Sequence, residues 1–141
     1  MSWKTVVVGF EGDEASERAL DRAAEIARRD GAVLIVTSIA RPLASGAAAR
    51  GIGPYDPADP PEEHRAELER ARELVAARGI EAELDLEVGE PADAIVALAE
   101  RRGADLIVVG THERHFLDRL LHGSVSEAVG KRAHCDVLIV H

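Results

Sequence analysis

The residues best suited to binding chemistry lie in the last third of the chain, where glycine and serine flank an apolar run. The segment Asp105-Leu-Ile-Val-Val-Gly110 ends in glycine, and Gly123-Ser124 opens a helical pattern. A buried strand that ends in glycine, followed by a Gly-Ser helix start, presents bare backbone N–H groups, and such groups bind anions. We therefore expect the N–H groups of residues 124–126 and the Ser124 hydroxyl to hold one or two phosphate groups.

The overall composition restricts which ligands this anion site can serve. The chain has 141 residues, of which 46% are apolar, and a formal net charge of −9. This size predicts one globular domain spanning residues 1–141. The acidic balance argues against nucleic acid and anionic membranes as partners, because binding them requires a basic face. A small phosphate ligand stays compatible, because backbone dipoles can hold one locally.

Cysteine use and hydropathy predict a cytoplasmic protein. Cys135 is the only cysteine, so no intrachain disulfide can form, and we expect it to pack as a small hydrophobe. The start of the chain, residues 1–5, leads into a strand pattern and lacks the apolar core of a signal peptide. No apolar run approaches the ~20 residues that a membrane-spanning helix needs.

Five strand-like runs alternate with four helical patterns along the chain. Asp13 and Asp59 are candidate N-caps for the first two helices, and Gly31 and Gly103 are candidate C-terminal stops for the first and third. The expected strands are 5–10, 32–39, 81–88, 106–109 and 137–140, and the expected helices are 14–30, 60–79, 92–102 and one that begins at 123–124.

Strict alternation of strands and helices predicts a parallel sheet with right-handed crossovers. Acidic and apolar residues alternate in 81–88, which is typical of an edge strand, whereas 106–109 is continuously apolar and reads as central. We therefore predict the α/β fold class: a single doubly wound five-stranded parallel sheet, order 3-2-1-4-5, with helices on both faces.

That strand order leaves the last strand at an edge without polar protection. An apolar edge strand is either covered or paired with another chain. We expect a homodimer in which residues 136–141 of two copies pair across a two-fold axis. The alternative is a monomer whose edge is shielded by His141 and a helix.

The same order places the candidate anion site at the point where the winding of the sheet reverses. Doubly wound sheets bind ligands at the carboxyl ends of the strands that flank this point. Here those ends are residues 9–13 and 110–112, with the 123–126 helix start nearby. Glycine at 110 and 123 permits positive φ and a close approach of the backbone to a ligand.

The chain resembles the universal stress proteins, which belong to the wider adenine-nucleotide α-hydrolase-like fold. Nucleotide-binding members use Gly-x2-Gly-x9-Gly followed by Ser or Thr. Here Gly110 and Gly123-Ser124 match this spacing, Glu113 replaces the second glycine, and Glu11 matches a position that is usually Asp. The resemblance covers essentially the whole chain and rests on the segments 11–13, 16–20, 89–91, 104–112, 123–127 and 134–140.

This resemblance implies an ATP or ADP site. Glu11 and the backbone near Ile39 would meet the adenine or ribose, residues 110–112 would line the ribose and phosphate path, and residues 123–125 would hold the phosphates. Mg²⁺ or Mn²⁺ would enter only through the phosphates, since no spacing matches a protein metal site. The expected nucleotide site comprises Phe10, Glu11, Ile39, Gly110, Thr111, His112, Glu113, Gly123, Ser124, Val125 and Ser126.

No catalytic machinery is visible in the sequence. It contains no Gly-x-Ser-x-Gly elbow, no Walker lysine and no evident nucleophile–base pair, so we expect no enzyme. The sequence therefore predicts a stress-response module that binds or senses adenine nucleotide as a homodimer without robust catalysis. One alternative is an interaction or scaffold protein that binds no nucleotide because the Glu113 carboxylate repels phosphate. An adenylyl-transferring enzyme of the same broad fold is the other.

Overall fold

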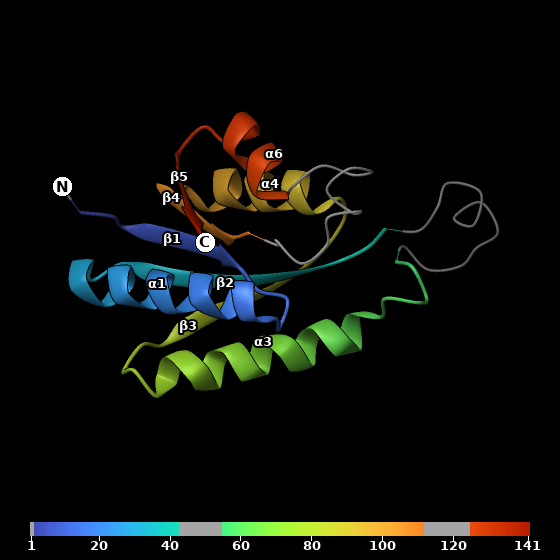
Figure 1. Cartoon of the computed structure of the whole chain (residues 1–141), viewed down its shortest axis with the longest axis horizontal. Helices are drawn as coiled ribbons and strands as arrows, with labels where there is room; N and C mark the ends of the chain where they lie inside the picture. Colours follow the sequence, from blue (N-terminus) through green and yellow to red (C-terminus); the bar gives the residue numbers. More distant parts are fainter. Residues whose placement is uncertain (1, 43–54, 112–124) are drawn as a thin grey trace.

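The computed structural model describes residues 2–42, 55–111 and 125–141 and places a parallel sheet between two layers of helices (Figure 1). The strand order is β3-β2-β1-β4-β5 and every neighbouring pair is parallel, which confirms the predicted topology. The elements are β1 (Thr5–Gly9), α1 (Glu14–Asp30), β2 (Val33–Ala40), α3 (Pro61–Ala76), β3 (Ala82–Val88), α4 (Pro91–Arg102), β4 (Leu106–Gly110), α6 (Val125–Arg132) and β5 (Asp136–Val140).

Helix α1 begins and ends where the sequence predicted, because both of its caps are encoded locally. The Asp13 side chain accepts a hydrogen bond from the Ser16 N–H at 2.9 Å, which satisfies one of the free donors at the helix start. Gly31 adopts the left-handed conformation, with φ of 68°, and ends the helix. The alanine-rich face between these caps is buried against the sheet.

Helix α3 starts differently from the prediction. Asp59 was the expected N-cap, but the capping residue is Pro60 and no side chain caps the helix. Pro61 follows at the first helical position, where proline needs no N–H partner. The Asp59 carboxylate instead accepts the Arg41 N–H at 2.7 Å and lies 2.7 Å from a His64 ring nitrogen. The Asp59 cap prediction is therefore wrong, because this carboxylate has other partners.

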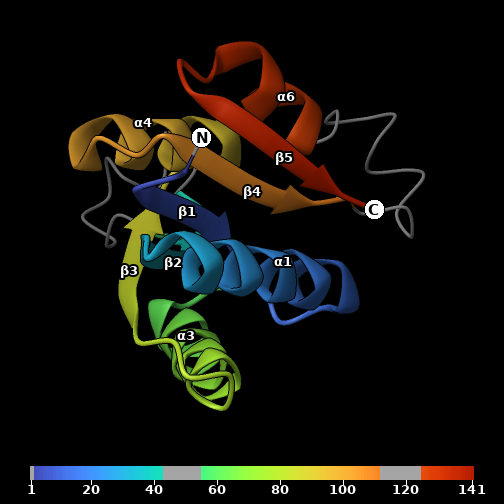
Figure 2. The same ribbon diagram turned by 90° about the vertical axis from the view of Figure 1, so that its left-hand side faces the viewer.

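The sheet has two cores because side chains alternate between its faces. Val6 and Val8 of β1 pack with α1 and α3, whereas Val7 between them packs with α4 and α6. All three valines are fully buried, as expected of a central strand. Figure 2 shows α1 and α3 on one side of the sheet and α4 and α6 on the other.

Strand β3 lies at one edge of the sheet, as its alternating pattern predicted. Its acidic residues do more than protect that edge, since Glu87 pairs with Arg101 and Glu83 pairs with Arg102. Both arginines lie in the last turn of α4, so these ion pairs fasten that helix to the edge strand.

Gly110 allows two stretches of backbone to pack closely together. The described glycines with positive φ are residues 12, 31, 79, 89 and 103, so Gly110 does not use the positive φ that glycine permits. A Cβ at Gly110 would lie 2.5 Å from the carbonyl oxygen of Ala15. Glycine is needed here because the end of β4 packs directly against the backbone of α1.

We predict that Gly110→Ala lowers the free energy of unfolding by about 1–3 kcal/mol, the range typical of overpacking. Gly130→Ala in α6 is the matched control, because a Cβ there meets nothing within 4 Å and alanine favours a helix by about 1 kcal/mol. Urea unfolding followed by circular dichroism measures both variants. Equal stability of Gly110→Ala and the wild type would show that the contact with Ala15 is easily relieved.

Asp105 joins the starts of the two central strands. Its carboxylate accepts the N–H groups of Thr5 at 2.9 Å and Lys4 at 3.0 Å, and its own N–H donates to the Thr5 carbonyl at 3.1 Å. Burial raises the pKa of the Asp105 carboxyl, but the hydrogen bonds from Thr5 and Lys4 outweigh burial, so the pKa lies below its ordinary value.

A lowered carboxyl pKa stabilises the fold above the unfolded pKa, near 4, and this contribution disappears as the pH falls through the folded value. We predict that Asp105→Asn lowers the free energy of unfolding by about 1–3 kcal/mol at pH 7 and by less at pH 3. Urea unfolding at both pH values tests this. Asp21→Asn, at an exposed carboxylate on α1, is the control and should change stability little.

Candidate functional site

A pocket opens at the carboxyl ends of β1, β2 and β4, on the side of the sheet where α4 begins. It therefore lies where the winding reverses between β1 and β4, as the sequence predicted. Its lining residues are Gly9, Phe10, Glu11, Ser16, Thr37, Ile39, Pro91, Ile95, Val109, Gly110 and Val125.

The structure brings part of the predicted site together in this pocket. Thr111 and Ser126 are described but do not line it, although each adjoins a residue that does. His112, Glu113, Gly123 and Ser124 lie outside the described residues. The predicted residues that line the pocket are Phe10, Glu11, Ile39, Gly110 and Val125.

The turn after β1 is held in a defined shape by Ser16. The Glu11 N–H donates to the Ser16 hydroxyl at 3.1 Å, and that hydroxyl donates to the Asp13 carbonyl at 3.1 Å. Gly12, with φ of 80°, permits the bend between them. Glu11 is thereby fixed at the pocket rim with its side chain exposed, whereas the Phe10 side chain belongs to the core.

Strand β2 supplies a wall whose polar groups already have partners. The Thr37 hydroxyl donates to an Asp85 carboxylate oxygen at 3.0 Å, and the Thr37 carbonyl accepts the Phe10 N–H at 2.9 Å. Burial raises the pKa of the Asp85 carboxyl above its ordinary value, and the hydrogen bond from Thr37 only partly offsets this. Thr37 thus fixes the wall, and Ile39 adds an apolar surface beyond it.

The start of α4 forms a part of the pocket that the sequence analysis did not assign. The Gly89 N–H donates to the Ala40 carbonyl at 3.0 Å, so the chain after β3 turns in at the end of β2. Pro91 then opens α4, and Pro91 and Ile95 line the pocket. The signal was available, because the Gly89-Glu-Pro91 step follows a strand and lies at the same carboxyl edge of the sheet. Gly9, Ser16, Thr37 and Val109 are the other unassigned lining residues.

Thr111 carries an unsatisfied polar atom beside this pocket. Its N–H donates to the Val140 carbonyl at 3.1 Å, which extends the β4–β5 pairing by one residue. Within the described part of the chain, its hydroxyl is the one buried side-chain oxygen or nitrogen without a hydrogen-bond partner. A buried unpaired hydroxyl costs about 1–3 kcal/mol, so a ligand group that bonds to it would recover that energy.

The pocket has apolar walls and a few polar groups at its rim. Ile39, Ile95, Val109 and Val125 give surfaces on which a flat ring can pack, and Glu11 offers a carboxylate. Among residues 2–42, 55–111 and 125–141, no group of three His, Cys, Asp or Glu could hold a metal ion. None of the helices in the described residues is long and apolar enough to cross a membrane.

Relatives of known family and structure share this architecture. The universal stress protein Rv1636 of Mycobacterium tuberculosis is 39% identical, and the alignment covers 99% of this chain and 97% of the relative. A universal stress protein crystallised in complex with cAMP has a TM-score of 0.79 and is 34% identical, covering 100% of this chain and 99% of the other.

A further solved structure is the universal stress protein from Archaeoglobus fulgidus in complex with dAMP, with a TM-score of 0.76 and 26% identity. It covers 100% of both chains. The sequence also matches the Universal stress protein family over residues 2–141. The agreement extends over the full sheet and its helices, and this chain belongs to the universal stress protein family.

Proposed function

We propose that this protein is a stress-response module that binds an adenine nucleotide, ATP or ADP, in the pocket between β1 and β4. The observation that carries the proposal is the pocket itself, with apolar walls and a carboxylate at the point of reversal. Two similar proteins of the family were crystallised with cAMP and dAMP, which supports adenine nucleotides as the ligand class.

Different residues in and beside the pocket would contact the base, the ribose and the phosphates of the nucleotide. The adenine ring would pack between Ile39 and Ile95, and the Glu11 carboxylate would accept a hydrogen bond from a ribose hydroxyl or the adenine amine. The Thr111 hydroxyl would donate to the ribose or to a phosphate oxygen. The phosphates would lie at residues 123–126, at the start of α6, and would carry any bound Mg²⁺ or Mn²⁺.

Binding without dedicated catalysis gives the nucleotide a regulatory role. Among the described residues that line the pocket, Ser16 and Thr37 carry hydroxyl groups. Both hydroxyls donate hydrogen bonds to protein acceptors. A nucleotide that binds one conformation better than another shifts the population toward it, and partners would read that shift. We place this function in the cytoplasm, on the sequence features described above.

The unprotected edge strand β5 supports a homodimer. It lies at the end of the sheet, and its four apolar residues, 137–140, are only partly buried. Leu138 and Val140 pack toward α1, and Val137 and Ile139 pack toward α6, so the outer edge of the strand is left without a cover from these helices. A second copy that pairs through residues 136–141 would cover it.

Calorimetric titration tests the nucleotide proposal. We expect ATP, ADP or cAMP to bind the wild type and Glu11→Gln to bind about tenfold more weakly, because a charge-assisted hydrogen bond contributes about 1.5–3 kcal/mol. Glu14→Gln on the first turn of α1 removes the same charge from an exposed position outside the pocket lining and serves as the control. Absence of binding at millimolar nucleotide, with and without Mg²⁺, would reject the proposal.

A second arm of the titration addresses the scaffold alternative. Glu113 stands where nucleotide-binding members have glycine, so Glu113→Gly is expected to bind ATP more tightly than the wild type. If only Glu113→Gly binds ATP, the natural chain is better described as an interaction protein. Equal or weaker affinity of Glu113→Gly would show that this carboxylate does not oppose the phosphates.

Sedimentation equilibrium tests the dimer. We expect the wild type to sediment as a dimer and Ile139→Lys to sediment as a monomer, because an edge-strand lysine opposes pairing between sheets. Val33→Lys is the control, since Val33 is 43% exposed at the start of β2, away from β5. A monomeric wild type at tens of micromolar, or a dimer that survives Ile139→Lys, would contradict pairing through β5.

A further inference from the structure

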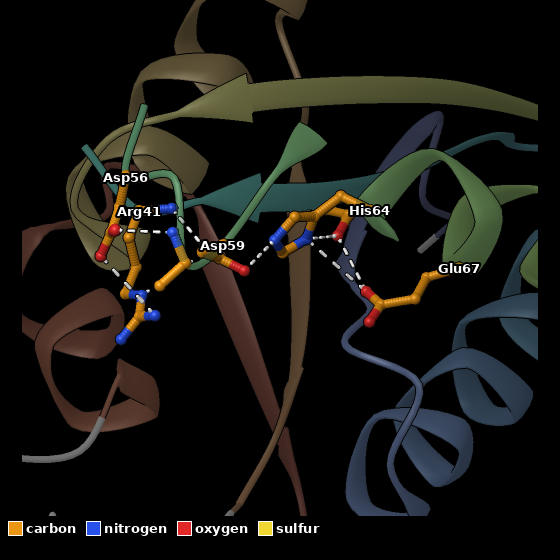
Figure 3. Close-up of polar contacts among 7 residues, drawn as sticks. Arg41, Asp56, Asp59, His64 and Glu67 are labelled. Atoms are coloured by element: carbon orange, nitrogen blue, oxygen red, sulfur yellow. Dashed lines mark hydrogen bonds and ion pairs between the residues drawn. The ribbon is translucent and has the colours of Figure 1, made fainter. Parts of the chain in front are cut away.

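A polar cluster with two buried and two partly buried members lies behind the pocket wall, on the opposite face of β2. Ser38, Asp59, His64 and Glu67 form it, and we call these four residues the His64 network (Figure 3). One ring nitrogen of His64, Nδ1, is 2.6 Å from the Ser38 hydroxyl, and the other, Nε2, is 2.7 Å from Asp59 Oδ1. The Ser38 hydroxyl is also 3.2 Å from Glu67 Oε2. No sequence motif marks this cluster, since Ser38 lies 26 residues from His64 and 29 residues from Glu67.

The network contacts two segments that line the proposed nucleotide pocket, strand β2 and the turn after β1. Ser38 lies between Thr37 and Ile39, both of which line the pocket from the other face of the same strand. Asp59 accepts the Arg41 N–H just beyond the end of β2. Glu67 packs against the turn that carries Glu11, because a Cβ on Gly12 would lie 3.5 Å from Glu67 Cγ.

The cluster resembles a Ser-His-Asp triad but is not placed to attack a substrate. Ser38 is 1% exposed and does not line the pocket. A nucleophile must reach the reacting atom of a substrate, and this hydroxyl instead faces α3. Its role must therefore be argued from the protons that it shares with its neighbours.

Counting protons shows that the network is complete with one proton shared between His64 and Glu67. With Nε2–H donating to the Asp59 carboxylate, a proton on Nδ1 donates to Ser38, and the Ser38 hydroxyl then donates to Glu67. With that proton on Glu67 instead, Glu67 donates to Ser38, and Ser38 donates to Nδ1. Every contact is satisfied in both arrangements.

Removing the shared proton leaves the single Ser38 hydrogen between two acceptors. One of the contacts, to His64 or to Glu67, then loses its hydrogen and sets two lone pairs against each other. The network also gains a negative charge beside Glu11. Burial raises the pKa of the Glu67 carboxyl, as do the charges of Glu11 and Asp59, and together these outweigh the opposing effects of His64 and Ser38.

Few other charged groups of the described residues surround the network. The Arg41 guanidinium lies 3.7 Å from a carboxylate oxygen of Asp59 and 3.7 Å from a carboxylate oxygen of Asp56. Arg70 of α3 donates to the Gly12 carbonyl and pairs with Glu17 on α1. Strand β3 turns apolar residues, Leu84 and Leu86, toward this side of the sheet. Among the described residues, a proton shared between His64 and Glu67 would therefore be the main positive charge available to balance Glu67.

We propose that the His64 network stores one proton behind the pocket, and that loss of this proton weakens the binding of an anionic nucleotide. The inference rests on the proposed function, because it assigns a regulation to the same pocket. His64 acts as a positioning residue, since it touches neither the pocket nor its ligand. Release of the proton both loosens the support of the Glu11 turn and adds a negative charge near the nucleotide.

Calorimetric titration with cAMP from pH 5.5 to pH 8.5 measures this coupling. The single phosphodiester charge of cAMP does not titrate in this range, so changes in affinity report on the protein. We expect the wild type to bind about three- to tenfold more weakly at the high end, as one added charge behind the pocket wall would produce. Thermal unfolding at each pH verifies that the protein stays folded.

Three variants assign the effect to the network. Glu67→Gln keeps the size of the side chain and removes the negative charge, so its cAMP affinity at pH 8.5 should match that of the wild type at pH 5.5. His64→Gln should also abolish the pH dependence. His134→Gln is the matched control, because it removes an exposed histidine paired only with Glu100 at 3.5 Å and should retain the wild-type profile.

The outcomes separate failure of the inference from failure of the proposed function. Absence of cAMP binding at every pH would reject the proposed function and the coupling with it. Binding without pH dependence in the wild type, or with the same dependence in Glu67→Gln, would overturn the coupling alone. If His64→Gln does not fold, Glu67→Gln decides the result, because glutamine can still accept the Ser38 hydrogen.

Discussion

The position of β1 between β2 and β4 is the constraint on which the rest of the structure depends. The winding reverses at β1, so α1 and α4 pack on opposite faces of the sheet, and a pocket opens at the carboxyl ends of β1 and β4. The reversal also brings the end of β4 against the start of α1. Gly110 has no room for a Cβ beside Ala15, so tight backbone packing sets one wall of the pocket.

Local sequence signals predicted the helices, the strands and their order, but they did not predict the hydrogen bonds among the polar side chains around His64. Asp13 and Gly31 define α1 because both caps act within a few residues, and the strand patterns give the sheet order. The expected cap at Asp59 failed because His64 and Arg41 use its carboxylate. The contact of His64 with Ser38 spans 26 residues, and no periodicity marks it. Sequence patterns indicate which residues are buried, whereas side-chain contacts between distant segments depend on how the elements pack in three dimensions.

Alternation along β2 joins the pocket to the polar interior. Thr37 and Ile39 face the pocket, while Ser38 between them faces α3 and the His64 network. A displacement of this short segment would change both faces together. The Ser38 hydroxyl connects the pocket wall to helix α3 through hydrogen bonds, in addition to the van der Waals packing between them. This explains why a polar residue occupies a buried position of β2.

An acidic protein that binds an anion must reduce the local repulsion at the site. Along the edge strand, arginines of α4 pair with Glu83 and Glu87, so these carboxylates add little to the field. The pocket rim has no such excess of arginine among the described residues, and the charge of Glu11 contributes to raising the pKa of Glu67 behind it. Among the described residues, two sources of positive charge are proposed, the amino end of α6 and a proton held by the His64 network. Of these two, only the proton responds to pH, so under the proposed coupling the affinity for an anion would depend on protonation.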